Sequence, residues 1–427
     1  MKKTLLFVLG LLLAAASLQA QQYDVLDQVR ADVRKSRGME GPHRFDNLGR
    51  LTPAPRGYKP FYISHYGRHG SRYAWNSNTY IIVHDALEKA AELDLLTPYG
   101  QEFRERYEAF YLEPWINSGD LVPLGFDQHQ RIGEIVYAAF PKVFAKDRKV
   151  YAVSSTAQRC IVSMGAFNLG LKSGNPRLRI QLRSTHEGMG VVAPPSVHKS
   201  LLRRFAGEES EVDLESSADF RARTVPDEAV LGRLFTDSAF LDELTGGRVK
   251  FCSELWQLIC GYHNYEFRPL FDDLITDDER VQYWEADNYF SFRGDITARY
   301  RMIPLLEDMM QKADSAFIDP TRAADLRFGH DYILEALVCL LNVDGEGTIP
   351  ETPEEVKYWF RNFDIPMAAT LLFVFYRDRK GDVLFKVLLN EHEATLPDLQ
   401  PVSGPYYRWT DFLAWANALL AAHPEIK

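Results

Sequence analysis

The distribution of apolar residues predicts strands followed by helices in the first part of the chain. Residues 60–66 (Pro-Phe-Tyr-Ile-Ser-His-Tyr) are rich in β-forming residues, which predicts a buried strand that ends in a loop over residues 67–73. Apolar residues then recur at helical spacing over residues 82–93, and again over residues 132–140. These two segments are therefore expected to form amphipathic helices.

The same order of strand, loop and helix occurs twice more. Residues 149–153 (Lys-Val-Tyr-Ala-Val) predict a strand, and Ser154-Ser155-Thr156 is expected to cap a following helix that carries Arg159. Residues 326–328 lead into Gly329-His330-Asp331, which a further helix follows. Alternation of strands and helices favours an α/β fold, in which ligands collect at the carboxyl ends of the strands.

The later part of the chain predicts an interruption and then a return of the sheet. Strand patterns become sparse over residues 183–319, which predicts a mainly helical insertion. Two β-rich runs, residues 370–376 and 383–389, flank a polar turn and predict a hairpin. The expected fold is therefore α/β, with a mixed sheet flanked by helices and a mainly helical insertion domain. The expected limits are an export signal over 1–20, a first part of the α/β core over 21–182, the helical insertion domain over 183–319 and a second part of the core over 320–427.

The first residues have the pattern of an export signal. Lys2 and Lys3 precede an apolar stretch over residues 5–16, and small and polar residues then lead to a cleavage site after Ala20. A membrane anchor is the alternative, but the apolar run is too short to span a bilayer. We therefore expect an exported protein, periplasmic or secreted, with no stable membrane insertion after the signal is removed.

Composition and charge narrow the class of ligand. The 427 residues are 46% hydrophobic, which is ample for a large core. The net charge of −10 becomes −12 without Lys2 and Lys3, since residues 1–20 contain no acidic residue. Such a protein has no general affinity for nucleic acid, and any anionic ligand needs a local positive pocket.

The four cysteines do not indicate a disulfide framework or a metal site. Cys252 and Cys260 lie eight residues apart in a helix-like run, which separates them by roughly 12 Å, too far for a bridge. We expect all four, including Cys160 and Cys339, to be buried thiols, with a disulfide that involves Cys160 or Cys339 as the alternative. No CxxC pair or HExxH run is present in the sequence, so no zinc site is indicated.

The run Arg68-His69-Gly70-Ser71-Arg72 is the strongest candidate for chemistry. Guanidinium groups bind phosphate oxygens with forked, charge-assisted hydrogen bonds, and an imidazole can attack phosphorus to form a covalent intermediate. Such a pattern arises by chance in about one chain of this length in a thousand. A surface loop with scattered basic residues is the alternative, but the position directly after a buried strand favours a phosphate site.

Two later positions extend this candidate site, and each has a structural alternative. Arg159, one turn into its helix, is placed to reach the same cleft, although an exposed helix arginine is equally ordinary. His330 and Asp331 stand where a strand leads into a helix, whose N-terminus favours a bound anion. Asp331 could instead be only the N-cap of that helix.

Together these segments resemble a known family. The loop of residues 68–72 is similar to the signature of the histidine phosphatase superfamily, and specifically of the histidine acid phosphatase branch, which includes phytases and multiple inositol polyphosphate phosphatases. Residues 121–128 (Leu-Val-Pro-Leu-Gly-Phe-Asp-Gln) resemble a second family segment, with Val122 in place of the usual Thr. Residues 153–159, with Ser163 further on, look like its second phosphate-binding segment, and residues 329–331 look like its histidine–aspartate proton-donor motif.

The resemblance implies a secreted phosphomonoesterase that acts through a phosphohistidine and uses no metal or organic cofactor. It implies His69 as nucleophile, Asp331 as proton donor, and a phosphate clamp made by Arg68, Arg72, Arg159 and His330. The expected substrate is a small anionic phosphate ester, most specifically an inositol polyphosphate such as phytate. Additional cations for such a substrate are expected among Arg183, His186, Lys199, Arg203 and Arg204, although the last three also fit a solvated basic helix face.

Two alternatives remain at this level. One is a broad-specificity acid or sugar phosphatase that scavenges phosphate. The other is a non-catalytic protein that binds a phosphate ligand, which the presence of both His69 and Asp331 disfavours. The sequence does not indicate the oligomeric state.

Overall fold

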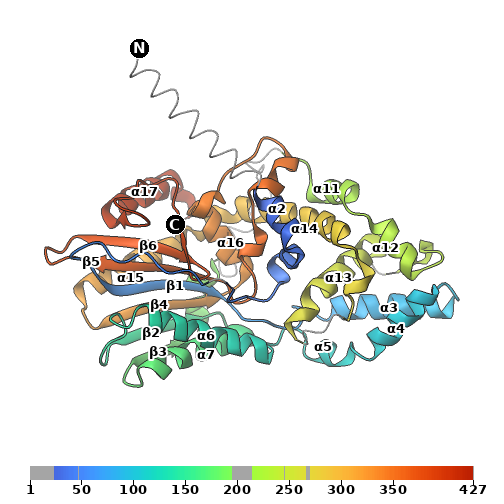
Figure 1. Cartoon of the computed structure of the whole chain (residues 1–427), viewed down its shortest axis with the longest axis horizontal. Coiled ribbons are helices and arrows are strands. Elements are labelled where there is room, and N and C mark those ends of the chain that lie inside the picture. The colour runs from blue at the N-terminus through green and yellow to red at the C-terminus, as the bar shows by residue number, and fades with distance from the viewer. Residues whose placement is uncertain (1–23, 47, 195–213, 245, 266–269, 427) are drawn as a thin grey trace, which may run out of the picture.

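The computed structural model describes residues 24–46, 48–194, 214–244, 246–265 and 270–426 (Figure 1). Within these ranges the strands form an eight-stranded mixed sheet in the order β3-β2-β4-β1-β5-β6-β7, with β8 paired to β6. The strands are β1 (Lys59–Arg68), β2 (Lys149–Ser154), β3 (Arg179–Arg183), β4 (Arg322–Gly329), β5 (Thr370–Arg377), β6 (Val383–Leu389), β7 (His392–Ala394) and β8 (Tyr407–Arg408). The expected strands and the late hairpin are confirmed.

The direction of the strands determines where their ends meet. β1 pairs in parallel with β4, and β2 pairs in parallel with both β4 and β3. β5 runs antiparallel to β1, and β6 runs antiparallel to β5. The carboxyl ends of β1, β4 and β2 therefore lie at one edge of the sheet, and the expectation of a mixed α/β sheet is confirmed.

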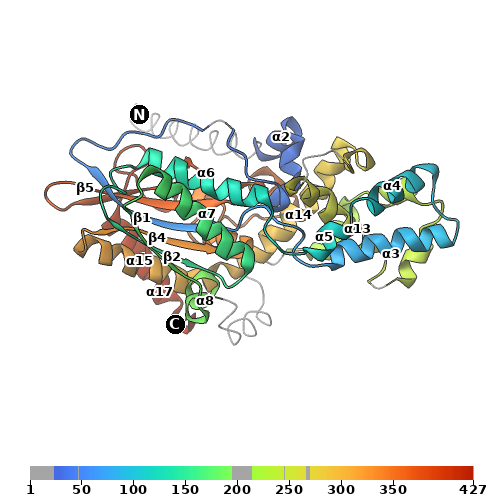
Figure 2. The same cartoon turned by 90° about the horizontal axis from the view of Figure 1, so that it is seen from below.

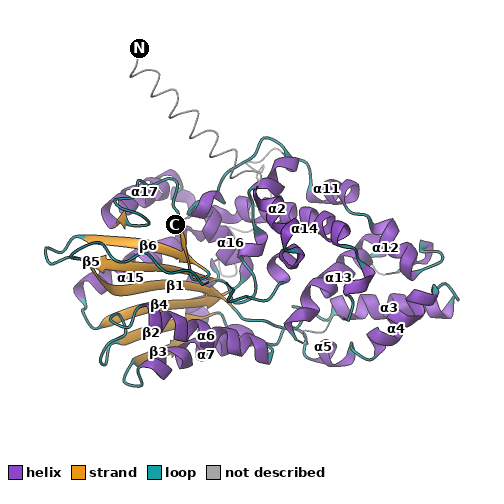
Figure 3. Ribbon diagram, viewed as in Figure 1, coloured by secondary structure: helices purple, strands orange, loops and turns teal. Residues whose placement is uncertain are grey.

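Helices cover both faces of the sheet (Figures 2 and 3). Along β1, Tyr62 and Tyr66 pack into the apolar cluster under α15 (Ile303–Ile318), α16 (Asp331–Leu340) and α17 (Trp409–Ala422). Ile63 packs into the cluster under α6 (Pro123–Ala139) and α7 (Gln158–Gly174). Neighbouring side chains of a strand point to opposite faces, so a strand buried on both sides is apolar almost throughout. This explains the continuous β-rich run of residues 60–66.

The α-helices are α2 (Asp24–Ala31), α3 (Asn78–Glu92), α4 (Pro98–Glu108), α5 (Leu112–Ile116), α6 (Pro123–Ala139), α7 (Gln158–Gly174), α8 (His186–Val192), α11 (Ser217–Thr224), α12 (Asp227–Leu234), α13 (Gly247–Gly261), α14 (Asp277–Ala298), α15 (Ile303–Ile318), α16 (Asp331–Leu340) and α17 (Trp409–Ala422). The 3-10 helices are η1 (Val33–Glu40), η2 (Ala239–Glu243), η3 (Tyr262–Asn264), η4 (Asp272–Leu274), η5 (Arg299–Met302), η6 (Val343–Gly345), η7 (Pro353–Tyr358), η8 (Asn362–Asp364) and η9 (Pro424–Ile426).

A helical lobe extends from the carboxyl-end side of the sheet, on the right of Figure 1. Its apolar cluster joins Leu87 of α3 and Phe103 of α4 to Leu234 of α12 and Trp256 of α13. The lobe therefore combines helices from before and after β2 and β3. The expected domain limits remain a prediction, and α3 and α4 pack with the helices of residues 183–319.

The cysteines agree with the expectation from sequence. Cys160, Cys252, Cys260 and Cys339 are all buried and unbridged. Burial raises the pKa of Cys160 to about 12, which keeps this thiol protonated and unreactive. The prediction of four buried thiols is confirmed.

The expected export signal, residues 1–20, lies outside the described residues. Among the helices that the structure describes, none combines the length and apolar character that crossing a membrane requires.

Candidate active site

The loop after β1 lies where three parallel strands end. In the register of β1 and β4, Arg68 stands opposite Gly329, and the backbone N–H of His69 donates to the carbonyl of Gly329 over 3.0 Å. On the other side of β4, the N–H of Ser155 donates to the carbonyl of Phe328 over 2.9 Å. The segments that follow β1, β2 and β4 are therefore held together by backbone hydrogen bonds.

His69 has the tautomer and charge that a nucleophile needs. Its Nδ1 lies 3.0 Å from the carbonyl oxygen of Gly70. A carbonyl oxygen can only accept, so Nδ1 carries the hydrogen and Nε2 keeps its lone pair. Burial lowers the pKa of His69 well below its ordinary value, and the charges of Arg72 and Arg68 lower it further. The imidazole is therefore neutral and able to attack through Nε2.

Hydrogen bonds from two helices position the loop. The hydroxyl of Ser163 on α7 accepts from the Gly70 N–H over 3.0 Å, and Oε1 of Gln128 on α6 accepts from the Ser71 N–H over 2.9 Å. A Cβ added at Gly70 would lie 2.3 Å from the carbonyl oxygen of Gly125, so the loop and α6 pack backbone against backbone. This close approach accounts for glycine at both positions.

Arg68 is fully buried beneath the loop and is fixed by three acceptors. Its Nη1 donates to the backbone oxygens of Met39 and Ile365, and its Nη2 donates to Oδ2 of Asp331 over 2.6 Å. A guanidinium held this firmly has one orientation, which favours recognition of a phosphate oxygen at a defined place.

Arg72 and Arg159 bring two more guanidinium groups to the site. Nη1 of Arg72 donates to the Tyr73 carbonyl over 3.0 Å, and Arg72 is 4% exposed. Nη1 of Arg159 donates to the carbonyl of Gly119 over 3.3 Å. The charges of Arg72, Arg68 and Arg159 each act to lower the pKa of His69.

His330 lies against His69. Its ring lies 5.7 Å from that of His69 between centroids, at an angle of 74°. Its Nε2 is 3.0 Å from the hydroxyl of Ser155. Burial lowers the pKa of His330 to about 4, although the carboxylate of Asp331 acts to raise it. His330 is therefore uncharged above that pH and can serve as a hydrogen-bonding group.

The expected helix cap before Arg159 is wrong in its details. α7 begins at Gln158, and Ala157 occupies the N-cap position without a side-chain hydrogen bond. The hydroxyl of Ser155 instead contacts His330 and accepts from the Ala157 N–H over 3.3 Å. Ser155, directly after β2, thus contacts both His330 in the site and the backbone of the turn.

Asp331 is paired with an arginine and is not the N-cap of α16. The N-cap is His330, and Asp331 is the first helical residue, where its Oδ1 accepts from the Tyr332 N–H over 2.8 Å. Burial raises the pKa of Asp331, but the charges of Arg68 and Arg72 outweigh this and lower it to about 2. The carboxyl group is therefore ionised in the unliganded protein.

Glu40, at the end of η1, is a site residue that the sequence analysis missed. Its Oε1 lies 3.2 Å from Nη2 of Arg72 and 3.9 Å from Nη2 of Arg68. Nothing in the polar segment before β1 marks this position, because Glu40 belongs to no motif and precedes the loop by 28 residues, from 40 to 68.

The remaining predicted substrate contacts stay predictions. Arg183 ends β3 and lines a separate cavity of about 410 Å³, together with Tyr151, Asp308 and Arg327. His186 begins α8 and is exposed. Lys199, Arg203 and Arg204 lie outside the described residues.

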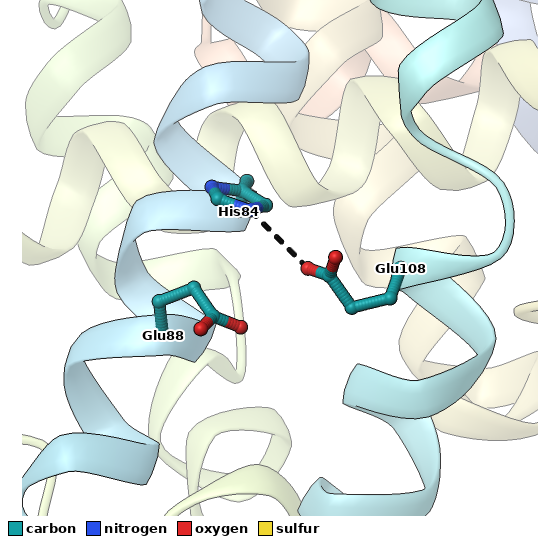
Figure 4. A group of neighbouring side chains, drawn as sticks. All are labelled: His84, Glu88 and Glu108. Carbon is teal, nitrogen blue, oxygen red and sulfur yellow. Dashed lines mark ion pairs between the residues drawn. The ribbon is translucent and has the colours of Figure 1, made fainter.

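One group of side chains in the described parts of the chain has the spacing of a metal site. His84 and Glu88 on α3 and Glu108 on α4 bring ligand atoms within 4.8 Å of one another (Figure 4). Arg104 donates to both oxygens of Glu88, over 2.6 and 2.9 Å, so this carboxylate is already neutralised. The group lies in the helical lobe, on helices drawn well away from the end of β1 in Figure 1, and takes no part in the phosphate site.

Comparison with known proteins agrees with this arrangement. Residues 67–219 match the family described as histidine phosphatase superfamily (branch 2). No curated protein sequence matches the chain.

Several solved structures share the fold. The multiple inositol polyphosphate phosphatase of Bifidobacterium longum, in complex with inositol hexasulfate, is 16% identical, with 90% of this chain and 97% of that chain covered and a TM-score of 0.73. The phytase from D. castellii is 14% identical over 91% of this chain and 85% of that chain, with a TM-score of 0.61. The Hafnia alvei phytase in complex with myo-inositol hexakis sulphate is 15% identical over 86% of this chain and 98% of that chain, with a TM-score of 0.59.

The family match covers the loop of His69 and the segment of Arg159, and the first of these solved structures shares the fold over 90% of the chain. Residues 67–219 are therefore similar to branch 2 of the histidine phosphatase superfamily, and the chain shares its fold with the solved phosphatase and phytase structures.

Proposed function

We propose that the protein is an exported phosphomonoesterase that forms a phosphohistidine at Nε2 of His69 and acts on inositol polyphosphates. The observation that carries this proposal is the state of His69, a neutral imidazole whose Nδ1 is tied to the Gly70 carbonyl and which stands among three guanidinium groups. A neutral nucleophile surrounded by cations suits attack on a phosphate ester, whose own charge repels anionic nucleophiles.

The proposed reaction has two steps. Arg68, Arg72, Arg159 and His330 bind the non-bridging oxygens, and Nε2 of His69 forms a bond to phosphorus as the bond to the ester oxygen breaks. Water then attacks phosphorus and the bond to nitrogen breaks, which releases inorganic phosphate and restores His69. Three arginines supply the charge stabilisation that a metal provides in other phosphatases.

Asp331 is proposed to give its proton to the departing oxygen and then to accept one from the attacking water. In the unliganded protein it is ionised, because Arg68 and Arg72 lower its pKa to about 2 despite burial. A bound phosphate offsets these two positive charges, and a monoanionic ester also brings a proton with it. Substrate binding is therefore the event that protonates Asp331.

The proposed preference for inositol polyphosphates rests on the similarity of the fold to solved structures. Two of the solved structures with this fold are complexes with inositol hexasulfate and with myo-inositol hexakis sulphate, each an inositol that carries six anionic groups. A broad acid or sugar phosphatase is the second candidate, because the residues of the site described above recognise one phosphate group and not the alcohol that carries it.

Two experiments test the proposed substrate and reaction, and a separate one tests export. The first measures phosphate release from phytate, glucose 1-phosphate and simple alkyl phosphates, with the inositol products identified. Preference for phytate supports the proposed substrate, and equal rates on all esters favour the broad phosphatase. Cell fractionation of the full-length chain tests export, which rests on residues 1–20, and retention in the cytoplasm would contradict it.

The second experiment uses His69→Ala, with His392→Ala as a matched control on an exposed histidine of β7. His69→Ala is expected to abolish turnover and the acid-labile phosphoenzyme while the protein stays folded. The control is expected to retain both. Full activity of a folded His69→Ala protein would falsify the mechanism.

A further inference from the structure

Glu40 is built into the phosphate site by the segment before β1. The Glu40 carbonyl accepts from Nδ2 of Asn264 over 2.7 Å, and the preceding carbonyl, that of Met39, accepts from Nη1 of Arg68. Asn264 in turn accepts from the hydroxyl of Ser71 over 2.8 Å. The end of η1 is thus fixed both to the catalytic loop and to the helical lobe.

The side chain of Glu40 lies against the two arginines of the loop. Its carboxylate accepts from Nη2 of Arg72 over 3.2 Å and lies 3.9 Å from Nη2 of Arg68, and 27% of this side chain is exposed. Asp331 accepts from the same Nη2 atom of Arg68 over 2.6 Å. Each of these guanidinium groups therefore has a carboxylate partner.

A carboxylate and a phosphate compete for the same groups. Both are anions that accept hydrogen bonds from the N–H groups of a guanidinium. A phosphate that binds Arg72 must either displace the Glu40 carboxylate or tolerate its negative charge a few ångströms away. Either event weakens binding of every phosphate species, including the inorganic phosphate that the reaction produces.

We propose that Glu40 acts as an internal competitor for phosphate at Arg72 and so promotes release of the product. This inference rests on the proposed function, since it assigns a role within the same phosphate site. Asp331 is assigned the transfer of a proton to the leaving group once substrate binding has protonated it, whereas Glu40 acts by its charge and its hydrogen bond to Arg72. Glu40 is thus a positioning residue that sets affinity.

The test compares Glu40→Gln with the wild-type protein. Glutamine keeps the length of the side chain and an oxygen that can accept from Arg72, but it removes the negative charge. Glu113→Gln is the matched control. Glu113 is an exposed glutamate close to the same loop in space, and its carboxylate accepts a hydrogen bond from the hydroxyl of Tyr73 over 2.8 Å. Thermal unfolding of each variant establishes that it is folded.

Binding of inorganic phosphate is measured by calorimetry at a pH of about 6, above the ordinary pKa range of carboxyl groups. Glu40→Gln is expected to bind phosphate about tenfold more tightly, because one unit charge beside a bound anion in a partly buried site changes affinity by about that factor. Its KM and its inhibition constant for phosphate should fall together, without a rise in kcat. Glu113→Gln should stay within about twofold of the wild type, as expected for an exposed charge.

The outcomes separate this inference from the proposed function. If the wild-type protein binds no phosphate, the proposed function fails and the inference fails with it. If the wild type binds phosphate and Glu40→Gln binds equally or more weakly, the competitor role is overturned while the proposed function stands. A loss of turnover in Glu40→Gln that is confined to alkyl esters would also overturn it, because it would make Glu40 a proton donor.

Discussion

The protonation of Asp331 offers the sharpest test of the proposed chemistry. Its Oδ2 lies 2.6 Å from Nη2 of Arg68, and its pKa is lowered from 3.8 to about 2. This difference corresponds to about 2.4 kcal/mol in favour of the carboxylate, at about 1.36 kcal/mol for each pKa unit. At a pH of about 5, roughly one unliganded molecule in a thousand carries the proton on Asp331.

A general acid contributes a factor of about 10² to 10⁴ to the rate, and a population of one in a thousand would cancel most of it. The proposed mechanism therefore requires the bound phosphate to raise the pKa of Asp331 by about two units or more. Asp331→Asn removes the proton donor while it keeps the shape of the side chain. We expect its kcat on an alkyl phosphate to fall by about 10² or more.

The assay compares leaving groups. The aryl oxide of an ester such as p-nitrophenyl phosphate leaves without taking up a proton. The kcat of Asp331→Asn on this ester should therefore fall by less than about tenfold. The wild-type kcat on the alkyl ester should fall on the alkaline side as Asp331 ionises in the complex, and this limb should be absent in the variant. Asp411→Asn, on an exposed residue of α17, is the control and should match the wild type.

Two results would refute this reasoning. Equal losses on the aryl and alkyl esters would remove Asp331 as the leaving-group acid. A wild-type alkaline limb that persists unchanged in Asp331→Asn would assign that ionisation to another group.

The remaining predictions concern packing and stability. Gly70→Ala would place a Cβ 2.3 Å from a backbone oxygen of α6, so we expect loss of activity and a lower Tm. Gly165→Ala, within α7 and with open space around it, should keep activity and should not lower Tm, because a helix favours alanine over glycine. Equal behaviour of the two variants would contradict this packing argument. Glu335 and Asp295 are neighbouring buried carboxyl groups; burial raises the pKa of both, and the charge of Asp295 raises that of Glu335 further. The folded protein therefore holds a proton that the unfolded chain loses above a pH of about 4, and its stability falls as the pH rises from there through the raised pKa values. In Glu335→Gln this fall should be smaller in denaturant titrations at acidic and neutral pH, and an unchanged pH dependence would show that the pair is not coupled to folding.

The parts of the fold that the sequence predicts are those with local patterns. Residues 60–66 and 370–376 read as strands because both faces of the sheet bury them, so that nearly every position is apolar. The loop of His69 is equally local, since its five residues are adjacent in the chain. His330 and Asp331 could be placed beside that loop because parallel strands end at one edge of a sheet.

The parts that the sequence does not predict depend on contacts between distant segments. Glu40 reaches the site because backbone oxygens of its segment accept from Arg68 and Asn264. Every residue has a backbone oxygen, so such contacts cannot be recognised from the types of residue in the sequence. Ser155 was expected to cap a helix but contacts His330, because its position at the end of β2 brings it beside the end of β4. In both cases the side chain is ordinary and only its neighbours are specific.

The charges of the site connect the roles proposed for Asp331 and Glu40. Arg68, Arg72 and Arg159 face two carboxylates, while His69 and His330 are neutral, so these groups together carry one positive charge when the site is empty. A phosphate dianion reverses that sign and leaves one excess negative charge in a largely buried site. Taking up a proton on a carboxyl group relieves the excess, which favours protonation of Asp331 when an ester is bound. The same excess acts against inorganic phosphate once the alcohol has left, so a single balance of charge favours both the first chemical step and release of the product.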